Sequence, residues 1–221
     1  ITKINKFIEL DDNINSCEFV LLDDGSTDGS GKFLRSKIKF YKNTPIFNLG
    51  RHSLNFGYGA AIQSGISLTK YDWVITFDAD GQHEAETVIK LVSHFKKCNS
   101  SLLFIGSRYF SSPITFRGIG RQLLNWSEYV FLGSKLVDSN SGLKAFNKNV
   151  YNELDQIIPA PPDMSFSQHL TQTFYALAPW AVKEIPIKIR DRELGNSKIR
   201  LKDFFVAFRQ NLTLSYSLKP R

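Results

Sequence analysis

The chain has 221 residues, of which 42% are hydrophobic and 22% are charged. This composition is typical of a globular domain and excludes a disordered or fibrous protein. No apolar run approaches the roughly 18–20 residues that a membrane-spanning helix needs, and the sequence predicts no signal peptide. Cys17 and Cys98 form no CxxC or Cys/His cluster, so we expect two structural thiols in a reducing compartment.

The net charge of +7 is concentrated near the C-terminus. Residues 181–221 contain 10 Lys/Arg against 4 Asp/Glu, which leaves 18 against 17 for residues 1–180. This asymmetry favours an anionic partner such as phosphates, nucleic acid or a membrane surface, and a solvated basic face is the alternative.

Short apolar runs alternate with helical patterns in the first half of the chain. We expect an opening helix over 4–10, a helix over 59–69, and strands over 18–22, 45–47, 73–77 and 102–106. This alternation predicts an α/β fold, with a mainly parallel sheet flanked by helices on both faces.

The pattern changes after Arg117. It predicts, in order, a long helix to about Leu136, a turn over 138–142, a helix over 166–177, a strand over 184–189 and a last amphipathic helix over 201–215.

Two acidic turns follow predicted strands. Asp23 and Asp24 follow the first strand, and Asp78 and Asp80 follow the strand over 73–77, with Gln82 and His83 close behind. Ligands bind beyond the carboxyl ends of the strands in open α/β sheets. Carboxylate and amide oxygens suit Mg²⁺ or Mn²⁺, and His83 could add a nitrogen ligand for Mn²⁺.

An acidic loop repels phosphates, so Asp23 and Asp24 would instead accept hydrogen bonds from the base or ribose of a nucleotide. The alternative for this loop is a tight turn that caps the next helix. The segment Asn55-Phe-Gly-Tyr-Gly-Ala-Ala61 is a glycine-rich entry to a helix, but it lacks the dinucleotide and P-loop patterns.

Six segments in chain order carry a family resemblance: LLDDGSTDGS, NFGYGAA, FDADGQH, GSRY, DSNSGLKAF and EIPIKIRDRELGNSK. Together they closely resemble the family 2 glycosyltransferases, and within that family the group of dolichol-phosphate-mannose synthase and its bacterial relatives. The resemblance implies a Rossmann-like GT-A fold and inverting transfer of a sugar from a nucleotide diphosphate sugar to a polyprenyl phosphate.

The resemblance also implies one GT-A domain over 1–221. Its nucleotide-sugar-binding half would be 1–110, its acceptor half 111–200, and its C-terminal amphipathic basic helix 201–221.

Residue roles follow from the same resemblance. Asp24, with Asp23 beside it, would contact the nucleoside, while Asp78, Asp80 and Gln82 would hold Mg²⁺ or Mn²⁺ against the donor diphosphate. Basic positions facing the acceptor phosphate match Arg117 and Arg121. The acidic residue facing the reacting centre matches Asp138. The loop that closes over the diphosphate matches Arg192, Ser197 and Lys198.

These residue types suit the chemistry. Displacement at the anomeric carbon builds negative charge on the departing diphosphate, which a metal with Arg192 and Lys198 would stabilise. The acceptor phosphate has a second pKa of about 6 and is already an anionic nucleophile. We therefore expect Asp138 to orient the acceptor or the sugar; the alternative is a helix-capping Asp in a turn.

Two departures from the family pattern stand out. The family's opening strand and its P-x-Y-N-E turn are missing, because the sequence starts at Ile1 within the pattern of the following helix. Relatives carry a carboxylate in the helix before the last strand, where this chain reads Phe166-Ser-Gln-His-Leu170. His169 fits a core or surface histidine.

A peripheral enzyme on the cytoplasmic face of a membrane is the hypothesis for location. The last helix offers Phe205, Phe208 and Leu212 beside Lys202 and Arg209 to an anionic surface. Alternatively, Phe204 and Phe208 pack onto the core. Transfer to a saccharide acceptor and a non-catalytic nucleotide-sugar-binding protein remain alternatives for function, whereas we expect no binding of nucleic acid.

Overall fold

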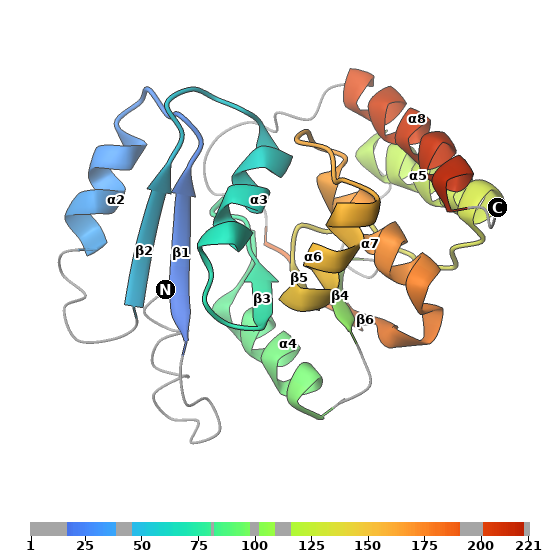
Figure 1. Ribbon diagram of the computed structural model, residues 1–221, viewed down its shortest axis with the longest axis horizontal. Helices are drawn as coiled ribbons and strands as arrows, with labels where there is room; N and C mark the ends of the chain where they lie inside the picture. Colours follow the sequence, from blue (N-terminus) through green and yellow to red (C-terminus); the bar gives the residue numbers. More distant parts are fainter. Residues whose placement is uncertain are drawn as a thin grey trace.

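The computed structural model describes residues 17–38, 46–80, 82–97, 102–108, 116–190 and 201–218. The side chains of residues 46, 96, 97, 116–119, 121 and 201–203 are outside this description. So is the helix predicted over 4–10. Within these ranges the chain forms two sheets with helices packed around them (Figure 1).

Most of the predicted elements are confirmed, with ends shifted by a few residues. The strands are β1 (Glu18–Asp23), β2 (Ile46–Arg51), β3 (Trp73–Thr76), β4 (Leu103–Ser107), β5 (Lys144–Asn147) and β6 (Val182–Pro186). The helices are α2 (Ser30–Ile38), α3 (Tyr58–Leu68), α4 (Ala85–Lys97), α5 (Phe116–Leu132), α6 (Lys148–Ile157), α7 (Phe166–Leu177), the short η1 (Pro179–Ala181) and α8 (Leu201–Ser217).

The sequence analysis missed β5 and α6. Strand β5 has four residues and a lysine on its core side, so its apolar signal is weak. Helix α6 begins where the Asn147 side chain accepts hydrogen bonds from the backbone N–H groups of Asn149 (3.0 Å) and Val150 (3.2 Å). This N-cap satisfies donors that have no partner within the helix.

The larger sheet has the strand order β3-β5-β4-β6. Strand β5 is antiparallel to both β3 and β4, while β6 is parallel to β4. Three of the four strands therefore run in one direction, which confirms the mixed, mainly parallel sheet. The central position of β5 places the turn before it at the carboxyl ends of β3 and β4.

The smaller sheet pairs β1 with β2 in parallel, with Leu21 opposite Leu49. Among the described residues, β1 pairs only with β2 and β3 only with β5. Helix α3 bridges the two parts, because it packs against β1, β2 and α7 (Figure 1). The start of α3 is therefore near elements of both sheets.

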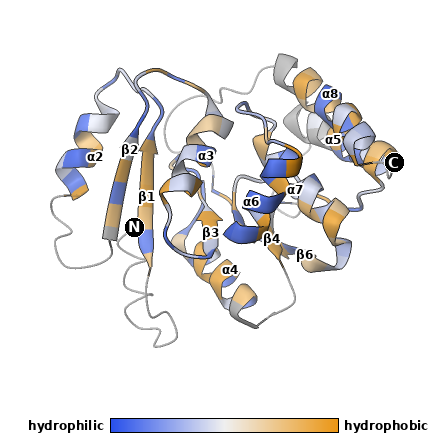
Figure 2. Cartoon of the chain, in the orientation of Figure 1, coloured by the Kyte–Doolittle hydropathy of each residue, from blue (hydrophilic) through white to orange (hydrophobic). Residues whose placement is uncertain are grey.

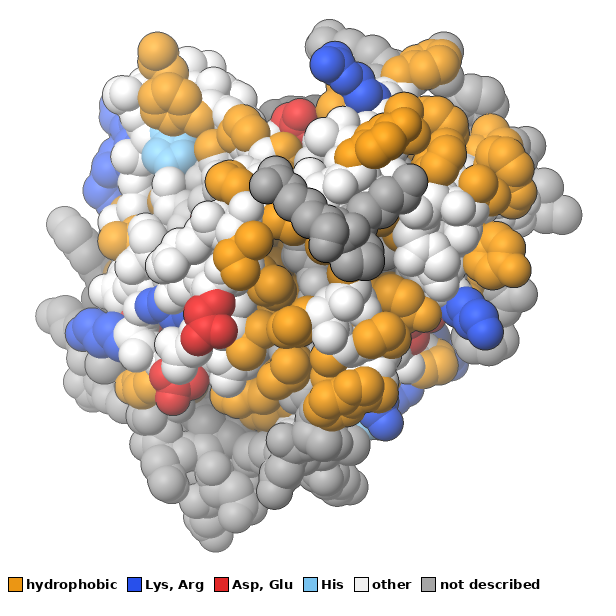
Figure 3. Space-filling model, turned by 45° about the vertical axis from the view of Figure 1, so that its right-hand side comes forward, with side chains coloured by type: hydrophobic (Ala, Val, Ile, Leu, Met, Phe, Trp, Pro, Cys, Tyr) orange, Lys and Arg blue, Asp and Glu red, His pale blue; other side chains and the backbone are white. Residues whose placement is uncertain are grey.

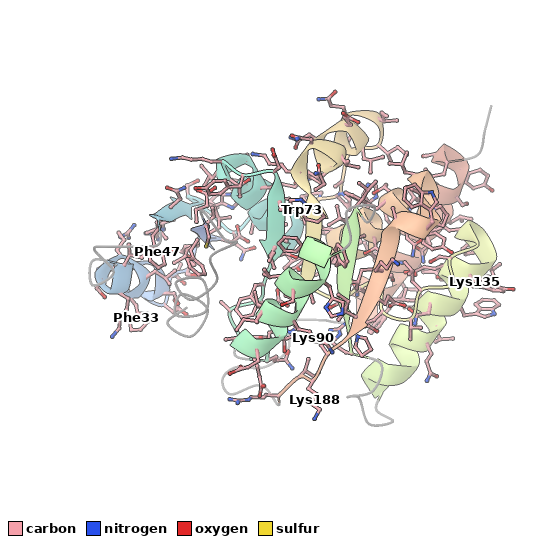
Figure 4. The ribbon with its side chains drawn as sticks, turned by 90° about the horizontal axis from the view of Figure 1, so that it is seen from below. Phe33, Phe47, Trp73, Lys90, Lys135 and Lys188 are labelled. Atoms are coloured by element: carbon pink, nitrogen blue, oxygen red, sulfur yellow. The ribbon has the colours of Figure 1, made fainter. Side chains whose placement is uncertain are left out.

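Successive side chains of each strand point to opposite faces of the larger sheet, and both faces are buried. The strands are among the more hydrophobic segments of the chain (Figure 2). Ile105 and Phe146 join a cluster with Phe166 and Phe174 of α7. On the other face the Trp73 ring stacks on Phe95 of α4, with 4.9 Å between ring centroids (Figure 4). None of the helices in the described ranges is long and apolar enough to cross a membrane.

Candidate active site

Three of the predicted segments meet at one edge of the larger sheet. Asp78 follows β3, Arg108 follows β4, and the turn over 138–142 leads into β5. The residue that begins β5, Lys144, is paired with Thr76 at the end of β3 and with Ile105 near the end of β4. Because β5 is antiparallel to its neighbours, its first residue lies beside the last residues of theirs.

The Asp78 carboxylate packs directly on this turn. A Cβ atom at Gly142 would lie 2.4 Å from Asp78 Oδ2, so a glycine is needed for the close approach. The Thr76 hydroxyl donates a hydrogen bond to the Gly142 carbonyl oxygen (2.7 Å). Burial raises the pKa of Asp78, the Asp80 charge raises it further, and the opposing effect of His83 is smaller than that of burial.

Arg108 and Asp138 form a bidentate ion pair at the centre of the site. Arg108 donates from Nε to Asp138 Oδ2 (2.7 Å), from Nη2 to Oδ1 (2.7 Å) and from its backbone N–H to Oδ2 (2.8 Å). Asp138 is completely buried, whereas 28% of the Arg108 side chain is exposed. Burial opposes the charge of Arg108, but the bonds to Asp138 raise its pKa. The structure therefore ties Asp138 to an arginine whose side chain keeps part of its surface exposed.

The sequence analysis quoted the GSRY segment but gave Arg108 no role. The sequence feature that could have identified Arg108 is a basic residue directly after a predicted strand, in a chain that has carboxylates at the ends of two other strands. We expected Asp138 to orient the acceptor or the sugar, and that role stays a prediction; in the structure both of its oxygens accept hydrogen bonds from Arg108.

Two further buried charges stand behind this pair and were not predicted. Lys144 is completely buried, and burial lowers its pKa to about 7 although Asp138 favours its charge. Its Nζ donates to the Ser141 carbonyl oxygen. Glu128 of α5 is also completely buried, and burial raises its pKa to about 7 although Ser139 donates a hydrogen bond to it. Lys144 lies in the DSNSGLKAF segment, in which the sequence analysis gave the lysine no role, and Glu128 lies in none of the segments that carry the resemblance.

The other acidic turn makes contact with the glycine-rich segment. Asp24 accepts hydrogen bonds from the backbone N–H groups of Phe56 (2.9 Å) and Gly57 (2.9 Å), and its Oδ1 lies 2.7 Å from Nδ1 of His52. Nε2 of His52 lies 2.9 Å from the Ser64 hydroxyl. Partial burial disfavours the Asp24 charge, but these hydrogen bonds lower its pKa overall.

Asp23 is 4% exposed and lies at the end of β1. Its Oδ1 accepts the Ser26 N–H (3.0 Å), and its Oδ2, which makes no hydrogen bond, lies 3.4 Å from Nε of Arg51. The hydrogen bonds from Ser26, and then the Arg51 charge, hold the pKa of Asp23 below its usual value. Both aspartates are therefore ionised at neutral pH.

Tyr58, the first residue of α3, connects the two ends of the site. Its hydroxyl lies 3.2 Å from Ser167 Oγ, and burial together with the Asp78 charge raises its pKa. The preceding residue, Gly57, binds Asp24. One turn of helix thus contacts the Asp24 loop and approaches Asp78.

The donor set suits a divalent cation that substrate phosphates help to hold. In the described ranges no three His, Cys, Asp or Glu side chains form a ready metal cluster. However, Mg²⁺ commonly uses one or two carboxylates, with substrate phosphates and water completing its shell. Asp78 and Asp80 interact electrostatically with His83, whose Nδ1 is buried without a hydrogen-bond partner. Asp80 also accepts the Gln82 backbone N–H (3.1 Å).

The remaining predicted residues are only partly placed. Arg117 and Arg121 lie in α5, but their side chains are outside the described residues. Arg192, Ser197 and Lys198 also lie outside them. His169 is a core residue, as predicted: it is 2% exposed, with its ring nitrogens near the Ile158 carbonyl oxygen (3.2 Å) and the Gln210 amide (3.1 Å).

Comparison with known proteins identifies the family. The family model described as "Glycosyl transferase family 2" matches residues 4–155. The chain belongs to glycosyltransferase family 2. It is a glycosyltransferase with the GT-A fold, as the sequence resemblance predicted.

Three curated relatives of the glycosyltransferase have modest identity to it. An uncharacterized protein of Methanocaldococcus jannaschii is 33% identical over 192 residues, which cover 81% of this chain and 72% of that protein. An undecaprenyl-phosphate 4-deoxy-4-formamido-L-arabinose transferase of Klebsiella pneumoniae is 28% identical over 82% of this chain. The chain spans about half (52%) of that protein. An undecaprenyl-phosphate mannosyltransferase of Micrococcus luteus is 25% identical, with 86% and 79% of the two chains covered.

A solved structure supports the fold. Glucosyl-3-phosphoglycerate synthase from Mycobacterium tuberculosis, crystallised with Mn²⁺, UDP and phosphoglyceric acid, has a TM-score of 0.68 and 19% identity. The likeness covers 100% of this chain and 73% of that one. At this identity the similarity concerns the fold alone.

Proposed function

We propose that this glycosyltransferase moves a sugar, with inversion, from a nucleotide diphosphate sugar to a polyprenyl phosphate. The observation that carries the proposal is the Arg108–Asp138 pair. A fully buried carboxylate accepts hydrogen bonds from Nε and Nη2 of a partly exposed arginine beside Asp78. A cation fixed in this way suits an acceptor that carries a phosphate, and two relatives are named as undecaprenyl-phosphate sugar transferases.

The donor would bind between the two acidic turns, in residues 1–110. Asp23 and Asp24 would form the part of the donor site that binds the nucleoside. Asp24 would act mainly by shaping the loop over residues 52–57. Asp78, Asp80 and Gln82 would hold Mg²⁺ or Mn²⁺ against the diphosphate, where the metal supplies charge stabilisation for the leaving group. Arg192, Ser197 and Lys198 would close over the diphosphate.

The acceptor would bind in residues 111–200 together with Arg108. Arg117 and Arg121 would add positive charge around its phosphate. In the transfer step a phosphate oxygen bonds to the anomeric carbon, while the bond from that carbon to the diphosphate breaks and the nucleoside diphosphate leaves with the electron pair. The acceptor phosphate is already anionic at neutral pH, so no general base is required. This agrees with an Asp138 whose oxygens are occupied by Arg108.

The lipid acceptor implies contact with a membrane, and we assign that contact to the outer surface of α5 and α8. These helices pack together. The surface consists of exposed side chains of both helices: Leu123, Trp126, Tyr129 and Val130 of α5, and Phe205, Phe208, Leu212 and Tyr216 of α8. Figure 3 shows hydrophobic side chains gathered on this side of the molecule. Tryptophan and tyrosine favour the interface between lipid and water.

The predicted packing of the last helix is correct in part. The Phe204 ring lies against Gly120 of α5, and Phe208 makes an edge contact with Phe131 while 40% of it stays exposed. Phe205 is 70% exposed and Arg209 is exposed beside it. These exposed side chains support the proposal of a peripheral membrane protein, on the cytoplasmic face as the sequence analysis expected.

A transfer assay with matched acceptors tests the function. The protein is incubated with Mn²⁺, a nucleotide diphosphate sugar, and either polyprenyl phosphate, the unphosphorylated polyprenol or an oligosaccharide. We expect a glycosylated lipid with polyprenyl phosphate alone, and loss of this product in Asp80→Ala but not in Asp72→Asn, an exposed control. Transfer to the oligosaccharide instead would assign the saccharide acceptor. Nucleotide binding without any transfer would indicate a non-catalytic protein.

A further inference from the structure

The turn that carries Asp138 is held from several elements. Glu184 of β6 accepts the backbone N–H groups of Val137 (2.9 Å) and Asp138 (2.7 Å). Thr171 of α7 donates to the Ser139 carbonyl oxygen (2.8 Å). Asp138 is therefore fixed through the backbone on both sides, and the position of Arg108 depends on it.

Glu128 contacts this turn from α5. Its Oε1 accepts a hydrogen bond from the Ser139 hydroxyl (2.5 Å), and its Oε2 accepts one from Nε2 of Gln172 on α7 (2.6 Å). Glu128 is completely buried, and the opposite charge near it is the buried Lys144. A short chain of contacts thus joins α5 to Ser139, to the adjacent Asp138 and to Arg108.

This arrangement is not the one that stability alone would favour. Burial of a carboxylate carries a desolvation penalty that an apolar or amide side chain avoids. The amide oxygens of Gln168 and Gln172 are both buried without a hydrogen-bond partner. The Gln172 oxygen has none because the Gln172 amide presents its NH₂ group to Glu128. Unsatisfied polar atoms and a buried charge in one place are typical of a functional site.

We propose that Glu128 is a positioning residue: by binding Ser139 from α5 it fixes the turn of Asp138, and Asp138 presents the Arg108 guanidinium in one orientation. The proposal rests on the proposed role of Arg108 toward the acceptor phosphate. It assigns a function to a buried charge of α5 that takes no part in the chemistry itself.

Two conservative variants test the proposal by kinetics. Glu128→Met keeps the length of the side chain and removes both acceptor oxygens, while the Gln172 NH₂ group keeps the Ser134 hydroxyl as a partner (3.3 Å), so we expect a folded protein. Ser139→Ala removes only the link to the turn. We expect each variant to lower kcat/KM for polyprenyl phosphate about tenfold, with the donor KM within twofold of the wild type. The double variant should be no worse than Glu128→Met, because both changes break the same hydrogen bond.

Ser127→Ala is the matched control. Ser127 precedes Glu128 on α5, is equally buried, and binds Asn211 of α8 (2.7 Å) rather than the turn. A purely structural role for Glu128 predicts that Ser127→Ala lowers the acceptor kcat/KM as much, or that the effects of Glu128→Met and Ser139→Ala add. Either result would overturn the proposal.

A spectroscopic measurement separates this proposal from the proposed function. In protein labelled with ¹⁵N-arginine, the Nε–H signal of Arg108, identified by its loss in Arg108→Lys, reports the hydrogen bond to Asp138. We expect this signal to shift or broaden in Glu128→Met and Ser139→Ala, but not in Ser127→Ala. An unchanged signal in the first two would overturn the positioning role. The expected shifts in a protein that transfers no sugar would support positioning while the proposed function fails.

Discussion

The Arg108–Asp138 pair shows how one buried residue prepares another for binding. Asp138 has no exposed surface and both of its oxygens accept hydrogen bonds from Arg108. The guanidinium therefore keeps its charge and one orientation, while part of the Arg108 side chain remains exposed. A free arginine would lose side-chain entropy on binding a phosphate, and here that entropy is already lost in folding.

Removal of the Asp138 charge tests this pair. In Asp138→Asn the Arg108 charge remains, partly buried, without its partner, and breaking a buried pair in this way costs about 3–5 kcal/mol. Because Arg108 is partly exposed, we expect a loss near the lower end of that range in urea unfolding. Asp72→Asn, at an exposed position, should change the unfolding free energy by less than about 0.5 kcal/mol. Equal stability of the two variants would contradict the energetic importance of the pair.

Glu128 predicts an unusual dependence of stability on pH. Its pKa is raised from 4.5 to about 7 by burial, so between these values the unfolded chain is ionised while the native protein keeps the proton. The native state binds more protons there, and the free energy of unfolding falls as pH rises from about 5 to 7. The free energy of unfolding of Glu128→Gln does not fall in this way. Relative to the wild type it should therefore increase by up to about 3 kcal/mol between pH 5 and 8.

The measurement is urea unfolding of both proteins across this range. Lys144, with its pKa lowered to about 7 by burial and raised in part by Glu128, contributes mainly above pH 7, so the difference between the two proteins from pH 5 to 7 reports Glu128. A constant difference across this range would show that Glu128 is ionised throughout.

At the scale of elements, α3 is the connection between the donor end and the larger sheet. Its first turn supplies the Gly57 N–H to Asp24 and places Tyr58 near Ser167 and Asp78. Gly59 lies against the loop between α6 and α7, where the Ala60 N–H donates to the Pro162 carbonyl oxygen (2.9 Å). The glycines of this segment therefore allow close packing of backbone on backbone.

Two glycines of α3 provide a matched test. A Cβ at Gly59 would lie 2.4 Å from the Pro161 carbonyl oxygen and 2.7 Å from the Pro162 carbonyl carbon, whereas a Cβ at Gly65 meets nothing within 4 Å. Gly59→Ala should lower the unfolding free energy by about 1–3 kcal/mol through this overlap. Gly65→Ala should raise it by about 0.5–1 kcal/mol, because alanine favours the helix. Thermal or urea unfolding distinguishes the signs.

At the scale of the molecule, helix α5 contributes both to the apolar surface that it forms with α8 and to the candidate active site. Helix α5 carries the exposed Trp126 on its outer surface and Glu128 on its buried side. The two residues are two positions apart, so they point in different directions from one helix. Binding of this surface to lipid would place α5, and the turn that Glu128 holds, beside the membrane.

Vesicle binding tests the surface. We expect sedimentation of the protein with vesicles of phosphatidylglycerol and phosphatidylcholine, weakened at high salt because Arg209 and its basic neighbours contribute. Trp126→Ser with Phe205→Ser should reduce binding at least about fivefold, since each removes a large apolar side chain from the contact. Phe33→Ser is the control: it is 60% exposed on α2, away from α5 (Figures 1 and 4). An equal loss with Phe33→Ser would show nonspecific adhesion.

Donor binding predicts a change in the stability of the whole domain. A nucleoside diphosphate that binds only the native state at about 100 times its Kd adds roughly 2.7 kcal/mol, which corresponds to about 5–10 °C in Tm for a chain of this size. We expect such a shift for one of UDP, GDP, CDP and dTDP with Mn²⁺, and its loss in Asp80→Ala. A shift independent of both metal and Asp80 would contradict the metal site.

The sequence by itself determined most of the elements, the α/β class and the family. Each strand-end motif, from the Asp24 turn to the Asp78 segment, is a local pattern, and local periodicity reports local structure. The ordered set of motifs fixed the resemblance that the family model confirms. The carboxylates at the strand ends could be identified from the sequence because their residue type and the apolar run before them are both features of a few adjacent residues.

The tertiary structure alone decided which residues act on one another. Arg108 and Asp138 are 30 residues apart, and they meet because the short strand β5 enters the sheet between β3 and β4. Glu128 reaches Ser139 only because α5 packs over that same turn. No periodicity marks such contacts, since a buried charge on a helix has the same local pattern as an exposed one. The partners of such a charge depend on how elements distant in sequence pack together. The buried hydrogen bonds of Glu128 follow from that packing.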